Sequence, residues 1–133
     1  MALTEDNQIV LKNEYRYCYD RELIELPSGI FEDNEKDPLI VAKRELLEET
    51  GYASDDWIYL GDTIENSAKL TNTIHLYLAK DCKKVSDQHL DKTEDIDVLI
   101  IPFDEAVNMV MENKVCCNCT AHAILKAARI MGI

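Results

Sequence analysis

The sequence predicts an α/β (α+β) fold in which a mixed β-sheet lies between helices. Short runs of alternating apolar and polar residues, typical of strands, occur before and after one strong helical segment, and two further helical segments follow them. The chain has 133 residues, of which 47% are hydrophobic, which is enough for one core of ordinary size. We therefore expect a single domain over residues 1–133.

Five segments are predicted to be strands, from short apolar runs or from the alternation expected of half-buried strands. They cover residues 8–17, 21–26, 57–62, 73–80 and 95–102. In the fourth segment, Ile74, Leu76 and Leu78 face one side and His75 and Tyr77 face the other. The second segment ends at the turn sequence PSG, and a polar loop follows it.

The helix over residues 38–50 has the clearest boundaries. Asp37 can cap its N-terminus, Pro38 suits its first position, and Gly51 suits the position after its last turn. Two later segments, 102–113 and 120–131, also have apolar residues at helical spacing. They follow the last strand and would complete the helical layers of the sandwich.

This first helix ends in the acidic sequence RELLEET. Glu45, Glu48 and Glu49 lie within about 100° on a helical wheel, where their charges repel one another and the helix dipole. A cluster of hard oxygen ligands suits Mg²⁺ or Mn²⁺, and the alternative is a solvated acidic face. We expect the opposite side of the wheel to pack; it carries Leu39, Ile40, Ala42, Leu46 and Leu47.

The overall charge is strongly negative. With 14 basic and 26 acidic residues, the net charge is −12, which disfavours extended contact with nucleic acids or anionic membranes. No apolar run reaches membrane-spanning length, and the start MALTEDNQ lacks the features of a signal peptide, so we expect a cytoplasmic protein. Its five cysteines are expected to be reduced thiols.

The sequence CCNCTAH brings Cys116, Cys117, Cys119 and His122 close together along the chain. These residue types can hold zinc, although they lack the paired CxxC spacing of common zinc sites. The alternative is a loop and the start of a helix, with thiols that can oxidise.

The stretch GIFEDNEKDPLIVAKRELLEETGY resembles the signature of the Nudix hydrolase family, which is Gly, then Glu, then Arg-Glu-aliphatic-x-Glu-Glu-x-Gly-aliphatic. The residues that fall on this motif are Gly29, Arg44, Glu45, Leu46, Glu48, Glu49 and Gly51. The resemblance implies a Nudix-like α/β/α sandwich with a mixed sheet and a pyrophosphohydrolase that acts on acid anhydrides with Mg²⁺ or Mn²⁺. It also suggests a homodimer.

The resemblance assigns roles to the residues of the acidic helix. Glu45, Glu48 and Glu49 would bind the metal, and Glu48 would also take part in catalysis. Arg44 would orient the glutamates, and its alternative role is a surface pair with Glu48, four residues away. Eight residues separate Glu35 from Arg44 where the family has seven, so the role of Glu35 is open.

The sequences EYRYCYDRELIELPSG and DQHLDKTEDIDVLIIPFDEA resemble the ADP-ribose pyrophosphatase branch of the family. By this resemblance, the Ser28 carbonyl would bind metal, Glu94 would activate or position water, and Arg16 would contact the phosphate or sugar of the substrate. The alternatives are a solvated acid for Glu94 and an ion pair with Glu14 for Arg16. The implied reaction is metal-dependent hydrolysis of the pyrophosphate bond of a nucleoside diphosphate linked to another moiety, with ADP-ribose giving AMP and ribose 5-phosphate.

Two departures from that branch leave the substrate open. Ser67 lies near a position where proline is common, and the chain begins almost inside the first strand, without the usual N-terminal extension. The alternatives are a hydrolase of another nucleotide sugar or nucleoside triphosphate, or a non-catalytic nucleotide-binding Nudix module.

Overall fold

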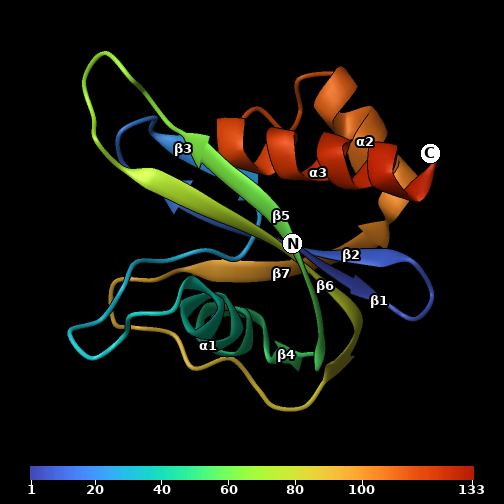
Figure 1. The fold of residues 1–133 in the computed structure, drawn as a ribbon, viewed down its shortest axis with the longest axis horizontal. Helices are drawn as coiled ribbons and strands as arrows, with labels where there is room; N and C mark the ends of the chain where they lie inside the picture. Colours follow the sequence, from blue (N-terminus) through green and yellow to red (C-terminus); the bar gives the residue numbers. More distant parts are fainter.

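The computed structural model describes all 133 residues as a seven-stranded mixed sheet between helices, which confirms the predicted fold class (Figure 1). The elements are β1 (Ala2–Thr4), β2 (Gln8–Arg16), β3 (Arg21–Glu25), α1 (Pro38–Thr50), β4 (Tyr52–Ala53), β5 (Asp56–Ile64), β6 (Thr73–Lys84), β7 (Ile96–Pro102), α2 (Phe103–Met111) and α3 (Asn118–Met131). Helix α1 covers one face of the sheet, and α2 and α3 cover the other. None of these helices is both long enough and apolar enough to cross a membrane.

Strand β1 joins two antiparallel groups of strands. It is antiparallel to β2 and parallel to β6, where Ala2 lies opposite Ala79 and Thr4 opposite Cys82. Strand β7 pairs with one edge of β2. Along the other edge, β1 pairs with the first half of β2 and β3 pairs with the second half of β2. Residues 73–77 of β6 extend past the short pairing with β1, so the sheet divides there.

The core has two parts, one on each face of the sheet. The larger part contains Leu11 from β2 and side chains of α2 and α3, among them Phe103 and Ile124. The smaller part contains Val10 from β2 and Leu46 from α1. Neighbouring residues of β2 therefore point to opposite faces, as the period of a strand requires.

The predicted boundaries of α1 are confirmed. The Asp37 side chain accepts a hydrogen bond from the Leu39 N–H at 2.9 Å, and Gly51, with φ of 76°, ends the helix by donating its N–H to the Leu47 carbonyl. Two short strands, β1 and β4, were not predicted, because two or three residues show no alternation. Helix α3 begins at Asn118, two residues before the predicted segment.

The prediction of which side of α1 packs was partly wrong. Ile40 is 54% exposed and Leu47 is 36% exposed, although both were expected to pack. Glu45 and Glu49 are buried instead, and Glu49 is only 2% exposed. The physical reason is that Lys12, a buried cation of β2, lies against Glu49 and draws the acidic side of the helix toward the sheet.

Replacing Gly51 by Ala is expected to destabilise the fold more than replacing Gly132, which ends α3 with nearly the same φ. Both changes put a Cβ in the left-handed region, at about 1–2 kcal/mol. At Gly51 the new Cβ would also lie 2.1 Å from the Ser86 carbonyl oxygen, whereas at Gly132 nothing lies within 4 Å. Urea unfolding of both variants should show a further loss of about 1–3 kcal/mol for Gly51→Ala. Equal losses would contradict the contact with Ser86.

Candidate functional site

The guanidinium of Arg44 gathers three carboxylates around helix α1. Its Nη1 donates to Glu45 Oε1 at 2.7 Å and to Glu48 Oε2 at 3.0 Å. Its Nε and Nη2 donate to the two oxygens of Glu35 at 2.8 and 3.0 Å, so Glu35 reaches Arg44 across the longer loop. The hydrogen bonds from Arg44 lower the pKa of Glu35. Arg44 also donates to the Ile30 carbonyl, which fixes the loop before the helix.

A second cation, Lys12, holds the third glutamate. Its Nζ lies 2.5 Å from Glu49 Oε1 and 2.9 Å from Glu14 Oε2, and both Lys12 and Glu49 are buried. Burial raises the pKa of Glu49 to about 7, and the opposing effect of Lys12 keeps the shift smaller than burial alone would make it. Lys12 was not among the site residues predicted from the sequence. Its only signal was a lysine within the otherwise apolar run IVLK.

The segment Ser28–Gly29 lies directly against two of these carboxylates. The Ser28 N–H donates to Glu49 Oε2 at 2.9 Å. A Cβ added to Gly29 would lie only 1.8 Å from Glu45 Oε1, so the backbone approaches this carboxylate closely and a side chain there would displace it. Glycine at position 29 thus allows Glu45 to keep its hydrogen bond with Arg44.

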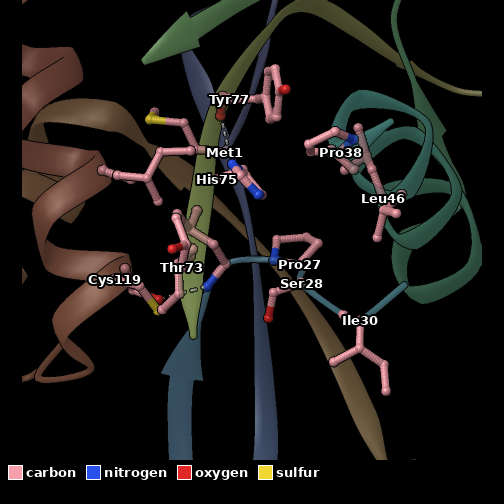
Figure 2. A pocket seen from close by; sticks show the side chains of 18 of the residues that line it. Met1, Pro27, Ser28, Ile30, Pro38, Leu46, Thr73, His75, Tyr77 and Cys119 are labelled. Carbon is pink, nitrogen blue, oxygen red and sulfur yellow. Dashed lines mark hydrogen bonds between the residues drawn. The ribbon is translucent and has the colours of Figure 1, made fainter. Parts of the chain in front are cut away.

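On the other side of this segment the structure has a cavity of about 360 Å³ (Figure 2). It opens where the sheet divides, between β6, α1, α3 and the loop after β3. Most of its wall is apolar. The labelled residues around it are Met1, Pro27, Ser28, Ile30, Pro38, Leu46, Thr73, His75, Tyr77 and Cys119.

One side chain on the cavity wall, His75, is held by two hydrogen-bonded side chains of β5, Asp62 and Tyr59. Its Nδ1 lies 2.6 Å from Asp62 Oδ1, and the Tyr59 hydroxyl donates to the same oxygen at 2.5 Å. The rings of Phe31 and His75 meet edge to face, with centroids 6.4 Å apart. Because the wall combines apolar and aromatic surface with a few fixed polar atoms, the cavity suits a flat heterocycle such as a nucleobase.

The predicted residue Glu94 lies near the acidic helix. Its charge contributes to raising the pKa of Glu45, after burial, which is the main cause. The preceding loop is fixed on the end of α1, because the His89 N–H donates to the Glu48 carbonyl and the Gln88 side chain donates to the Glu49 carbonyl. The structure therefore brings Glu94 into the neighbourhood of the glutamates.

The predicted residue Arg16 is engaged in ion pairs. Its guanidinium donates twice to Glu25, at 2.5 and 2.9 Å, and lies 3.1 Å from Glu14. It is not among the residues that line the cavity. Arg16 thus adopts the alternative contact expected from the sequence, together with a stronger one to Glu25.

No three His, Cys, Asp or Glu side chains converge in the arrangement of a metal site, and this holds for the cysteine cluster as well as for α1. In α1 the carboxylates face Arg44 and Lys12. Two of them nevertheless reach a single cationic atom, Arg44 Nη1, and all three present hard oxygens. The chemistry of this donor set fits Mg²⁺ or Mn²⁺.

These features define an α/β/α domain in which the loop after β3 lies between an acidic helix and a cavity. The chain belongs to the Nudix family, because the family model described as NUDIX domain matches residues 1–115. A solved structure titled "Crystal structure of ADP compounds hydrolase" has the same fold, with a TM-score of 0.84 and 16% identity. It is matched over 98% of this chain and 69% of that one.

Several relatives have names that describe functions. The methanol dehydrogenase activator of Bacillus methanolicus is 34% identical over 86% of this chain and 62% of its own length. The ADP-ribose pyrophosphatase of Bacillus subtilis is 27% identical over 93% of this chain and 67% of its own length. A GDP-mannose pyrophosphatase of Cronobacter sakazakii is 28% identical over 81% of this chain and 60% of its own length. This chain thus spans about two thirds or less of these relatives.

Replacing Lys12 by Met is expected to destabilise the fold by about 3 kcal/mol at about pH 8, because it leaves Glu49 buried without a cation. The pKa of Glu49 already exceeds its ordinary 4.5, and it would rise further in this variant. A carboxyl whose pKa is raised by folding makes the folded protein less stable as the pH rises. The destabilisation by Lys12→Met should therefore be smaller at about pH 5.5, where Glu49 is protonated.

Urea unfolding at both pH values measures this difference. Lys80→Met is the matched control, since Lys80 forms an exposed pair with Asp56 at 3.1 Å and should contribute at most about 1 kcal/mol at either pH. A loss for Lys12→Met that does not depend on pH would argue against a charged Glu49 as its cause.

Proposed function

We propose that this chain is a Mg²⁺- or Mn²⁺-dependent pyrophosphohydrolase that cleaves the diphosphate bond of a nucleoside diphosphate linked to another moiety. The first candidate substrate is ADP-ribose, which would give AMP and ribose 5-phosphate. The observation that carries the proposal is the position of Ser28–Gly29, which touches Glu45 and Glu49 and also forms part of the cavity wall. A base in the cavity would place its diphosphate beside the acidic helix.

The carboxylates of Glu45, Glu48 and Glu49 and the Ser28 carbonyl would hold the divalent cation, which when bound offsets phosphate charge and makes water more acidic. Among these groups Glu48 is the most accessible, with 41% of its side chain exposed. Its carboxylate accepts a hydrogen bond from Arg44, which positions the carboxylate without burying it. Glu48 is therefore free to meet the substrate, whereas Glu49 also supports the fold.

Three further residues, Arg44, Glu94 and Arg16, would position the glutamates, accept a proton and contact the substrate. Arg44 keeps Glu45 and Glu48 together, and it stays protonated because its contacts with Glu35 and the other glutamates raise its pKa. Glu94 would accept a proton from the water that attacks phosphorus, since it lies near Glu45 and is only partly buried. Arg16 would contact phosphate or sugar only by giving up part of its pairing with Glu25.

Two other functions fit the same site. Relatives named GDP-mannose pyrophosphatase favour another nucleotide sugar as substrate, with guanine in the cavity. A binding module without turnover would use the same cavity and the same acidic helix. A homodimer, suggested by the resemblance, also belongs to the proposal.

The substrate class is tested by measuring phosphate-containing products from ADP-ribose, GDP-mannose, NAD⁺ and nucleoside triphosphates, each with Mg²⁺, with Mn²⁺ or with a chelator. We expect metal-dependent release of AMP from ADP-ribose. Turnover of GDP-mannose alone would replace the substrate but keep the reaction. Heat of nucleotide binding in calorimetry, with no product from any compound, would favour the binding module.

Glu48→Gln and Glu94→Gln are each expected to lower kcat by about 10²-fold or more, because each removes a charge used during the reaction. Glu112→Gln is the matched control, since Glu112 is exposed at the end of α2, pairs with Lys114 and lies outside the proposed site. Thermal unfolding should place all three variants near the original protein. Full activity in either of the first two variants would remove that residue from the mechanism.

A further inference from the structure

Two cysteines at the start of α3 have their sulfur atoms in contact. Cys117 precedes the first residue of the helix and Cys119 lies in its first turn. Their Sγ atoms are 3.5 Å apart, within hydrogen-bonding distance for thiols, and both side chains are half-buried. The S–S bond of a disulfide is about 2.05 Å long, so the two sulfurs would have to approach each other by about 1.5 Å.

The two thiols are not equivalent. The hydrogen bond from Cys119 lowers the pKa of Cys117 to about 6, against the opposing effect of burial and with help from the N–H of Thr120. The same contact raises the pKa of Cys119. The hydrogen bond between the two sulfurs thus favours loss of one proton from the pair, and the direction of the two shifts makes Cys117 the candidate nucleophile.

We propose that Cys117 and Cys119 form a thiol-modification site that a peroxide converts to an intramolecular disulfide. The Cys117 thiolate attacks one oxygen of hydrogen peroxide, the O–O bond breaks, and the hydroxide released takes up a proton to become water. The Cys119 thiol then attacks the sulfur of the resulting sulfenic acid, loses its proton, and releases a second water. Two thiols and one peroxide thus give one disulfide and two waters.

The position of the pair connects it to the cavity. Cys119 lies on the cavity wall (Figure 2), whereas the neighbouring Cys116 is exposed and its sulfur lies 3.6 Å from Arg21 Nη2. The disulfide would therefore shift the Cys119 side chain on the cavity wall. The modification itself does not depend on the proposed hydrolase activity.

The experiment treats the folded protein with hydrogen peroxide, blocks free thiols under denaturing conditions, and measures intact mass. We expect three blocked cysteines out of the five in the chain, since two are joined, and the two hydrogens lost, about 2 Da, should return on reduction. Cleavage after Lys114 and Lys126 puts Cys116, Cys117 and Cys119 in one peptide, so single variants must identify the pair.

Cys116→Ser is the matched control and should form the disulfide at the original rate. Cys117→Ser should slow the reaction of this peptide with peroxide by about tenfold or more, because it removes the thiolate. Cys119→Ser should form no disulfide in this peptide and should leave a sulfenic acid on Cys117 that dimedone traps. The proposal fails if Cys116→Ser abolishes the disulfide, if Cys117→Ser retains it, or if the first cysteine oxidised is the exposed Cys18.

Discussion

The pairing of a like-charged helix face with two cations is the constraint on which the rest of the structure depends. Glutamates three and four residues apart, at the negative end of a helix, repel one another. Lys12 satisfies one of them from inside the sheet, and Arg44 satisfies two others while also binding the preceding loop. The two cations therefore set the position of α1 on the sheet and the course of the loop that separates the glutamates from the cavity.

Much of the fold could be predicted from local signals. The boundaries of α1 follow from a capping Asp37 and a C-terminal Gly51, and five strands follow from short apolar runs and alternation. The two shortest strands carry no such signal, because their positions are determined by pairing with distant strands. The exposure of Ile40 and Leu47 could not be predicted either, since a helical wheel does not include a charge on the sheet below it.

The candidate site was also only partly predictable from the sequence. Its glutamates and Arg44 are close in sequence and have a recognisable spacing, so a motif is sufficient to find them. Lys12 and the cavity wall come from segments that only the fold brings together. The ion pair of Arg16 with Glu25 spans two strands, so its strength depends on the strand register, which sequence periodicity does not define.

The three-residue strand β1 has a mechanical consequence. It is the only strand that connects the group β2, β3 and β7 to the group β4, β5 and β6. Because β1 is so short, few backbone hydrogen bonds join the two groups, and the cavity lies beside this junction, between β6 and the loop after β3. The mutual angle of the two groups therefore depends on side-chain packing as well, and α1 spans the junction because it contacts β2 and β7 of one group and β4 and β6 of the other.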